Sequence, residues 1–251
     1  MDNSSYINIS RQSGLLREMS VIANNIANIS TTGFRREGVV FSEYVKQIGA
    51  RPDSGSVAGG FERSVSMGNA GAHFSDFSSG GLERTGGNYD FAIDGEGFFL
   101  IDTPVGERLS RAGNFMTNGD GMLVTIDGDN VLDEAGAPIQ IPPNVSLVAV
   151  AGDGSISADG NPLGKIAVVT APPEALQRVG GNLWQVKDGQ DFETAQTPRM
   201  LQGFLEGSNV EPILEIARMI EVQRAYEAGQ KLLDIDDDRI SKTIRTISQS
   251  P

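Results

Sequence analysis

Apolar residues near the start of the chain recur with the spacing of a helix. Successive apolar positions are separated by 4, 3, 4 and 3 residues, and they are Leu15, Met19, Ile22, Ile26 and Ile29. This heptad spacing keeps one apolar face against a partner helix. It predicts a helix over residues 6–29, within an N-terminal coiled-coil segment at 1–33, although a helix in an ordinary core shows the same periodicity.

A second helical pattern fills the end of the chain, residues 206–251. Its positions step by 3 and 4 throughout, and they are Met219, Val222, Tyr226, Gly229, Leu233, Asp236, Ile240, Thr243 and Ile247. We expect Asn209 to cap this helix, with Glu211 and Pro212 in its first turn. A helix with one apolar stripe needs a partner, and the N-terminal helix is the obvious one. Because that helix is shorter, part of the C-terminal stripe is expected to stay uncovered and to form a protein–protein surface.

Between the helical segments, the pattern changes to short apolar runs separated by turns rich in glycine and aspartate. The runs are residues 91–93, 98–101, 122–126, 130–132, 145–150 and 166–170. Short runs at intervals of roughly ten residues predict antiparallel strands, arranged as a sandwich or partly closed barrel over residues 82–205. The expected fold class is therefore α+β, with long terminal helices that pair as a coiled coil and a central β domain.

Two stretches rich in glycine, serine and proline are predicted to be irregular connections. Residues 34–81 are expected to form an extended linker, flexible at 49–60 and irregular again over 67–81. Residues 172–198 contain Trp184, the only tryptophan, and are expected to lead from the β domain back to the C-terminal helix.

The composition narrows the range of partners. The 251 residues carry a net charge of −13, so no basic surface is available to neutralise phosphates, which argues against nucleic-acid and membrane partners. No apolar run approaches the ~20 residues of a membrane span. Cysteine is absent, which excludes disulfides and thiolate chemistry. The start of the chain lacks the basic and apolar regions of a cleaved secretory signal.

No arrangement of residues points to a catalytic centre, a cofactor or a metal ion. Gly95 and Gly97 begin like a dinucleotide-binding loop, but Leu100 replaces the third glycine. The acidic clusters lack the residue order of a calcium loop and are interpreted as turns and a solvated helix face; they are Asp127, Asp129 and Asp133, and Asp234, Asp236, Asp237 and Asp238. His73 is the only histidine and is interpreted as structural. The chain is therefore not expected to be an enzyme, but an acidic secreted β-domain enzyme or binding protein stays open as an alternative, since acidic side chains can converge in a fold.

Three separate stretches of the chain have the character of family signature motifs. The first is residues 23–36, with Asn24, Asn25, Asn28, Gly33 and Phe34. The second is residues 82–99, and the third covers 202–211 and 219–227, with Gln223, Arg224 and Tyr226. Together they resemble, in the right order, the signatures of the axial proteins of the bacterial flagellum, the family of rod, hook and hook-associated subunits. Residues 109–115 depart from the usual Tyr-Thr-Arg start of another family segment, since the chain has Leu109-Ser110-Arg111 there.

This resemblance implies a structural subunit of the flagellar basal-body rod that assembles with itself and with other rod subunits into a helical tube. The residues implied in assembly are the apolar positions of both helices: Leu15, Met19, Ile22, Ile26, Ile29, Met219, Val222, Tyr226, Leu233, Ile240 and Ile247. The chain is short for a hook protein, and residues 6–12 and 41–45 look most like those of a proximal rod subunit. Distal rod and hook-type subunits are the alternatives.

The resemblance also implies how the chain reaches its location. A subunit of the periplasmic rod would leave the cytoplasm through the flagellar type III export apparatus, without a cleaved signal peptide. Phe41 and Val45 match the spacing of the element that the export gate recognises in related subunits. The simpler interpretation of these two residues is packing against the neighbouring domain.

Overall fold

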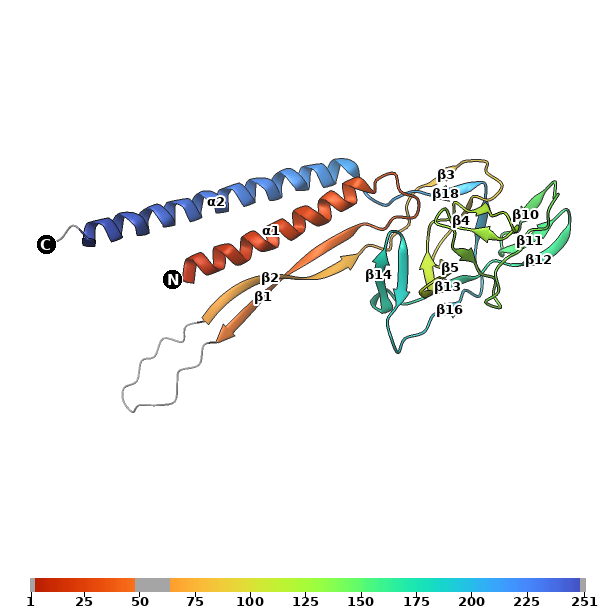
Figure 1. Ribbon diagram of the computed structural model, residues 1–251, viewed down its shortest axis with the longest axis horizontal. Coiled ribbons are helices and arrows are strands. Elements are labelled where there is room, and N and C mark those ends of the chain that lie inside the picture. The colour runs from red at the N-terminus through yellow and green to blue at the C-terminus, as the bar shows by residue number, and fades with distance from the viewer. Residues whose placement is uncertain (1–2, 48–63, 249–251) are drawn as a thin grey trace. The chain divides into compact units, whose positions relative to one another are not determined.

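The computed structural model describes residues 3–47 and 64–248 (Figure 1). The chain forms two compact units. The first, called here the helix–hairpin unit, comprises residues 1–27, 37–76 and 211–251, and the second, the β unit, comprises residues 28–36 and 77–210. The described residues form two α-helices and mostly antiparallel sheets, which confirms the α+β class.

The helix–hairpin unit consists of two helices and one strand pair. Its elements are α1 (Asn3–Ala27), β1 (Glu37–Gln47), β2 (Ser64–Ser75) and α2 (Pro212–Ser248). The two helices lie side by side and run in opposite directions, and the antiparallel β1–β2 pair lies along α1 (Figure 1). Leu15, Ile22 and Val222 are buried where α1 packs on α2, and Val21 and Val39 are buried where α1 packs on β1. Within the described ranges, neither helix contains a stretch that is both long and apolar enough to cross a lipid bilayer.

The predicted helix ends need correction. α1 ends at Ala27, so Ile29 lies beyond it, in a turn where the Thr31 hydroxyl donates to the side-chain oxygen of Asn28. Side chains that bond locally in this way compete with helical hydrogen bonds. α2 begins at Pro212, and the first-turn N–H of Glu215 donates to the carbonyl of Glu211.

The sequence predicts that Asn209 caps α2, but the contacts of its side chain lie elsewhere, within the β unit. Its side-chain oxygen accepts the N–H of Arg36 at 2.7 Å, and its amide group donates to the carbonyl of Ser78 at 3.0 Å. These bonds join three segments of the β unit that are far apart in the sequence, around residues 36, 78 and 209. Because α2 begins at Pro212, the residue directly before the helix is Glu211 and not Asn209.

The segment 34–81 is not an extended linker in its described parts. β1 pairs with β2 in antiparallel register, from Glu37 opposite Ser75 to Gln47 opposite Ser64. The prediction of irregular structure from Met67 onward is therefore wrong as far as Ser75. β2 is rich in glycine, alanine and serine and lacks apolar alternation, so its strand character depends on pairing with β1 and is invisible to a local pattern. The stretch predicted to be flexible, 49–60, lies outside the described residues.

The β unit is built from short strands. They are β3 (Leu82–Arg84), β4 (Phe91–Ile93), β5 (Phe98–Thr103), β6 (Gly106–Ser110), β7 (Met116–Thr117), β8 (Leu123–Val124), β9 (Asn130–Val131), β10 (Val148–Val150), β11 (Ser155–Ala158), β12 (Asn161–Lys165), β13 (Val168–Thr170), β14 (Leu176–Gly180), β15 (Leu183–Val186), β16 (Glu193–Thr194), β17 (Met200–Gln202) and β18 (Phe204–Glu206). A 3₁₀ turn, η1 (Pro173–Ala175), precedes β14.

The largest sheet of the β unit has nine strands among the described residues. Seven follow the order β14-β15-β6-β5-β9-β8-β7, β13 joins β5, and β16 joins β13. β10, β11 and β12 form a separate sheet, and β17 pairs with β4 and β18 with β3. None of these sheets closes into a barrel, so the barrel form of the prediction is not supported.

Strand β5 is central because both of its faces are buried. Phe99 and Ile101 face one apolar core, which also contains Phe115, whereas Phe98 and Leu100 face a second core. Successive side chains of a strand point to opposite faces, so a continuous apolar run is what a strand between two cores requires.

The second core corrects the prediction for residues 172–198. This region contains the β14–β15 strand pair, which joins the large sheet through β6. Trp184 on β15 is only 2% exposed and packs in the second core with Phe98 and Leu176. Only parts of the region are irregular, and proline and glycine at its turns had hidden the strands between them.

Candidate functional site

The apolar seam between α1 and α2 brings together most of the residues predicted for assembly. The cluster contains Leu15, Met19, Ile22, Ile26, Met219, Val222, Ala225 and Tyr226. Leu233 is half-buried farther along α2. Ile29 is not part of the seam, and Ile240 and Ile247 lie in α2 at positions whose side chains are outside the described ones. The seam therefore forms within one chain, and a coiled-coil geometry for it stays a prediction.

Polar contacts fix the register of the two helices. The Gln12 amide donates to the carbonyl of Tyr226 at 3.0 Å, and Arg218 pairs with Glu18 at 2.9 Å. The packing of Gln12 explains why position 229 is a glycine, because a Cβ at this position would collide with the Gln12 amide. The glycine that interrupts the apolar seam in the sequence makes room for a buried polar side chain on the other helix.

Asn25, a signature residue, joins three elements of the helix–hairpin unit. Its side chain is fully buried, donates to the Glu37 carbonyl at 2.8 Å and accepts the Glu37 N–H at 3.0 Å. It also donates to the Glu215 carboxylate at 3.2 Å. Asn25 thereby links α1 to the start of β1 and to the first turn of α2. The neighbouring Asn24 is exposed and lies 3.4 Å from the Glu37 carboxylate.

A second apolar stripe lies on the opposite face of α2. Ile213, Ile216 and Ile220 are 82%, 50% and 45% exposed, and they are spaced by 3 and 4 residues. At ~100° per residue, this stripe is about half a turn around the helix from Val222, which faces α1. The sequence had predicted an uncovered apolar surface only where α2 extends beyond the end of the shorter α1. Gln223 and Arg224, two signature residues, are also exposed on α2.

The remaining signature residues form the turn that opens the β unit. Gly33 has φ +67° and donates its N–H to the Glu206 carbonyl at 2.7 Å. Phe34 is 1% exposed, and the guanidinium of Arg178 lies 4.4 Å from its ring centroid. Asn28 is half-buried at the start of the same turn.

A buried charge cluster lies next to this turn, and sequence reasoning missed it. Glu206 pairs with Arg35 at 2.8 Å through one oxygen and with Arg111 at 2.7 Å through the other, and all three side chains are at most 2% exposed. Arg111 also donates to the carbonyls of Ile93, Gly95 and Gly97. Burial lowers the pKa of Arg111 below its usual value and the charge of Arg35 adds to this, while Glu206 opposes it. Arg35 and Glu206 lie in signature stretches and Arg111 lies in the family segment 109–115, which is the only signal the sequence gave.

Among the described residues, no group of three or more histidine or acidic side chains is placed to hold a metal ion. The Asp133 carboxylate accepts the N–H groups of Ala135 and Ala137, as turn chemistry predicts. Asp127 and Asp129 come from one turn, between β8 and β9, and line a polar hollow with Asn28 and Asn114. Phe41 and Val45 both lie in β1, with backbones opposite Ala70 and Ser66, and their side chains are outside the described ones.

Replacing Asp129 with asparagine is expected to stabilise the β unit slightly at neutral pH. Burial raises the pKa of Asp129, and the charges of Asp127 and Asp102 raise it further. A raised carboxyl pKa means that the fold disfavours the charged form, so the penalty is present at neutral pH and disappears as the pH falls through the raised pKa. Solvent screens this half-exposed group, so we expect a gain of only about 0.3–0.5 kcal/mol. Urea unfolding at pH 7 and pH 3 tests this, and an equal gain at both would contradict the electrostatic cause.

Comparison with known proteins agrees with these features. Three family models match: "Flagella basal body rod protein" over residues 6–35, "Flagellar hook protein FlgE/F/G D1 domain" over 92–158, and "Flagellar basal body rod FlgEFG protein C-terminal" over 201–246. The flagellar basal-body rod protein FlgF of Caulobacter vibrioides is 39% identical over 238 residues, 93% of each chain. FlgF of Mesorhizobium japonicum is 34% identical over 98% of each chain, and FlgG of Bacillus subtilis is 32% identical over 97% of this chain and 98% of its own.

The chain therefore belongs to the family of flagellar basal-body rod proteins, and within it is FlgF-like. The distal rod protein FlgG, at 32% identity, is not better supported as a relative than FlgF, at 39%. The matched segments at the two ends contain most of α1 and most of α2, the two helices that carry the apolar seam.

Proposed function

We propose that this protein is a non-enzymatic structural subunit of the flagellar basal-body rod, which assembles with rod subunits through its terminal helices. The relatives that align with this chain over nearly their whole length are named as basal-body rod proteins. The observation that supports assembly is the exposed stripe Ile213, Ile216 and Ile220, because α1 already covers the other face of α2. Three large apolar side chains in helical register on an uncovered face are what a second helix requires.

The two apolar faces of α2 have different roles in this proposal. The seam with α1, including Met219, Val222 and Tyr226, holds the helix pair of one subunit together in the manner of a coiled coil. The opposite stripe contacts the helices of neighbouring subunits. Because the contacting patches differ, repetition without ring closure produces a helical tube. The location that follows is the periplasmic rod.

Replacing Ile216 with glutamate is expected to prevent assembly without unfolding the subunit. The side chain is 50% exposed, so the charge stays hydrated in the isolated protein, but burial in a subunit interface would leave it unpaired. We expect basal bodies without incorporated variant, and loss of motility, in cells that carry only this variant. Isolated basal bodies probed with an antibody against this chain measure incorporation.

The matched control is Ile126→Glu, which makes the same change at a 68% exposed position of the β unit, in a segment that belongs to neither helix. This control is expected to assemble normally. Normal incorporation of Ile216→Glu, with circular dichroism like that of the parent protein, would refute the role of the stripe.

We further propose that Phe41 and Val45 form the element recognised during type III export. Recognition of an unfolded chain needs only the sequence, so the position of both residues in β1 of the folded protein does not oppose it. Phe41→Ala is expected to slow secretion several-fold, measured as the ratio of secreted to cellular protein, while the purified variant keeps its helix content. Unchanged secretion would leave these residues with a packing role only.

A further inference from the structure

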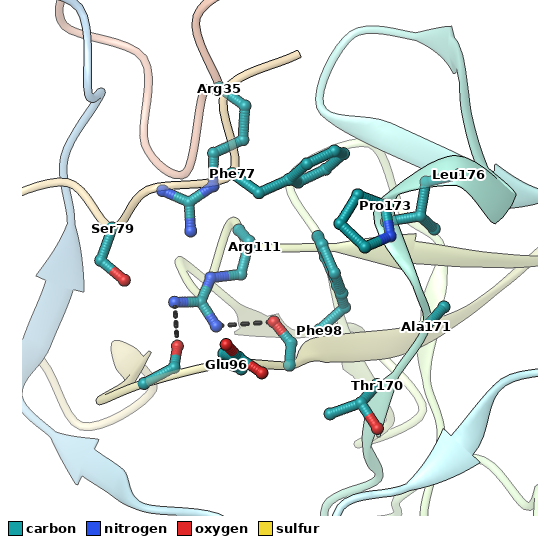
Figure 2. Close-up of a pocket in the computed structure, with 12 residues that line it drawn as sticks. Arg35, Phe77, Ser79, Glu96, Phe98, Arg111, Thr170, Ala171, Pro173 and Leu176 are labelled. Carbon is teal, nitrogen blue, oxygen red and sulfur yellow. Dashed lines mark hydrogen bonds between the residues drawn. The ribbon is translucent and has the colours of Figure 1, made fainter. Parts of the chain in front are cut away.

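A cavity of about 150 Å³ lies beside the buried charge cluster of the β unit (Figure 2). The guanidinium groups of Arg35 and Arg111 lie at one end, and Phe77, Phe98, Pro173 and Leu176 lie around the rest. A cavity of about 150 Å³ with apolar walls is large enough to admit a benzene ring. The space is therefore ligand-sized and combines a cationic end with an apolar body.

The charges at the cationic end do not balance. Two guanidinium groups, Arg35 and Arg111, share a single buried carboxylate, that of Glu206. Burial lowers the pKa of Arg111, Glu206 raises it, and the like charge of Arg35 lowers it further, so the two guanidinium groups repel each other beside the carboxylate that they share. An additional anion next to these groups would be stabilised in a region that excludes most water.

Arg35 also has a donor that no acceptor among the described residues satisfies. Its Nη1 donates to the Ser78 carbonyl and pairs with Glu206, but its Nε is buried without a hydrogen-bond partner. Arg111 differs, since its Nε, Nη1 and Nη2 all have acceptors. A buried N–H of a charged group without an acceptor is costly, and native structures rarely keep one without a reason. Arg35 lines the cavity, so a ligand there can supply the acceptor.

We propose that this cavity binds a carboxylate carried on a compact apolar group. The planar carboxylate matches the guanidinium of Arg35, and the apolar group packs against Phe77, Phe98 and Leu176. Glu96 also lines the cavity, and its exposed carboxylate repels anions. This repulsion favours a monoanion over a doubly charged phosphate, and the apolar walls favour a ligand with a hydrocarbon body.

The test is a titration of the ¹⁵N-labelled full-length protein with benzoate and with benzamide, followed by amide chemical shifts. The two probes share the ring and differ in the charge. We expect benzoate to shift the amides of Gly97, Thr170 and Ala171 saturably, and benzamide to bind at least about tenfold more weakly, since a charged hydrogen bond is lost. Equal binding of the two probes, or shifts spread over the surface without saturation, would overturn the proposal.

Two variants make the assignment specific to the cavity. Ala171→Phe fills the cavity from its own wall and is expected to abolish benzoate binding. Glu96→Gln removes the repelling charge at an exposed position and is expected to tighten benzoate binding about two- to fivefold. Because Glu96 is exposed, this second variant keeps the test decisive even if Ala171→Phe does not fold. Unchanged affinity in Glu96→Gln would contradict a carboxylate bound in this cavity.

A further arm separates two sources of the carboxylate, a free small molecule and an acidic side chain of a neighbouring copy. Sedimentation velocity of concentrated protein is compared with and without saturating benzoate. Dissociation of oligomers by benzoate assigns the natural carboxylate to a neighbouring chain, whereas unchanged sedimentation with retained benzoate binding assigns it to a small molecule. The outcome does not depend on the Ile216→Glu test, which addresses α2 alone.

Discussion

Replacing Glu206 with glutamine is expected to lower the free energy of unfolding of the β unit by about 3–5 kcal/mol. Both carboxylate oxygens are used, one by Arg35 and the Gly80 N–H and the other by Arg111, at 2.7–2.9 Å. Glutamine has nearly the same shape but no charge, and its NH₂ group would face a guanidinium. Two guanidinium groups would then lie in the interior without a counter-charge, and this effect exceeds the loss of the hydrogen bonds themselves.

Urea unfolding followed by the fluorescence of Trp184 measures this effect, because the only tryptophan is buried in the same unit. The matched control is Glu134→Gln, which removes the partner of Lys165 in a pair with side chains 36% and 29% exposed. Solvent screens that pair, so its loss is expected to cost less than about 1 kcal/mol. If the two variants lose the same free energy of unfolding, burial does not increase the contribution of the Glu206 cluster to stability.

Replacing Gly33 with alanine is expected to cost about 3 kcal/mol or more, the second of the two largest effects. The residue has φ +67°, a left-handed conformation that costs an L-residue with a side chain roughly 1–2 kcal/mol. In addition, the new Cβ would lie 2.5 Å from the backbone of Arg111 and Ala112. Backbone cannot rotate away as a side chain can, so the turn must move and the bond from the Gly33 N–H to the Glu206 carbonyl must weaken.

Gly86→Ala separates the two causes. Gly86 has φ +73°, but a Cβ there would have no heavy atom within 4 Å. This control is expected to show only the conformational cost, about 1–2 kcal/mol. The same denaturation experiment gives both values. If Gly33→Ala costs no more than Gly86→Ala, the close approach to Arg111 and Ala112 has no energetic consequence.

Elements whose cause is local could be predicted from the sequence. Helical spacing identified α1 and α2 and the residues of their seam, because periodicity is written along a single segment. The Asp127-Gly128-Asp129 turn between β8 and β9 and the apolar run of β5 were visible for the same reason. Among the signature residues, Asn25 and Gly33 have clear roles, but the wording of the signature did not show which bonds they make.

Elements that depend on distant residues could not be predicted. β2 is a strand because β1 pairs with it, and its own sequence carries no alternation. Arginine and glutamate are rarely buried, so no local rule would place Arg35, Arg111 and Glu206 in an interior. Their burial is explained only when distant segments come together, since Arg111 and Glu206 are 95 positions apart and Arg35 is farther still from Glu206. The exposed stripe on α2 was missed because a single face was expected to be apolar.

The hydrogen bonds of the turn at Gly33 have a consequence for the order of folding. α1 and α2 meet across very long stretches of chain, such as the 214 residues between Gln12 and Tyr226, and closing so long a loop is slow and entropically unfavourable. The β unit contains the bonds Gly33 to Glu206 and Arg36 to Asn209, which hold the residue stretches after α1 and before α2 together. Once these bonds form, the search of one helix for the other becomes local. Helix pairing is thus expected to be the last step of folding, and until it occurs a neighbouring chain can compete for the same apolar faces.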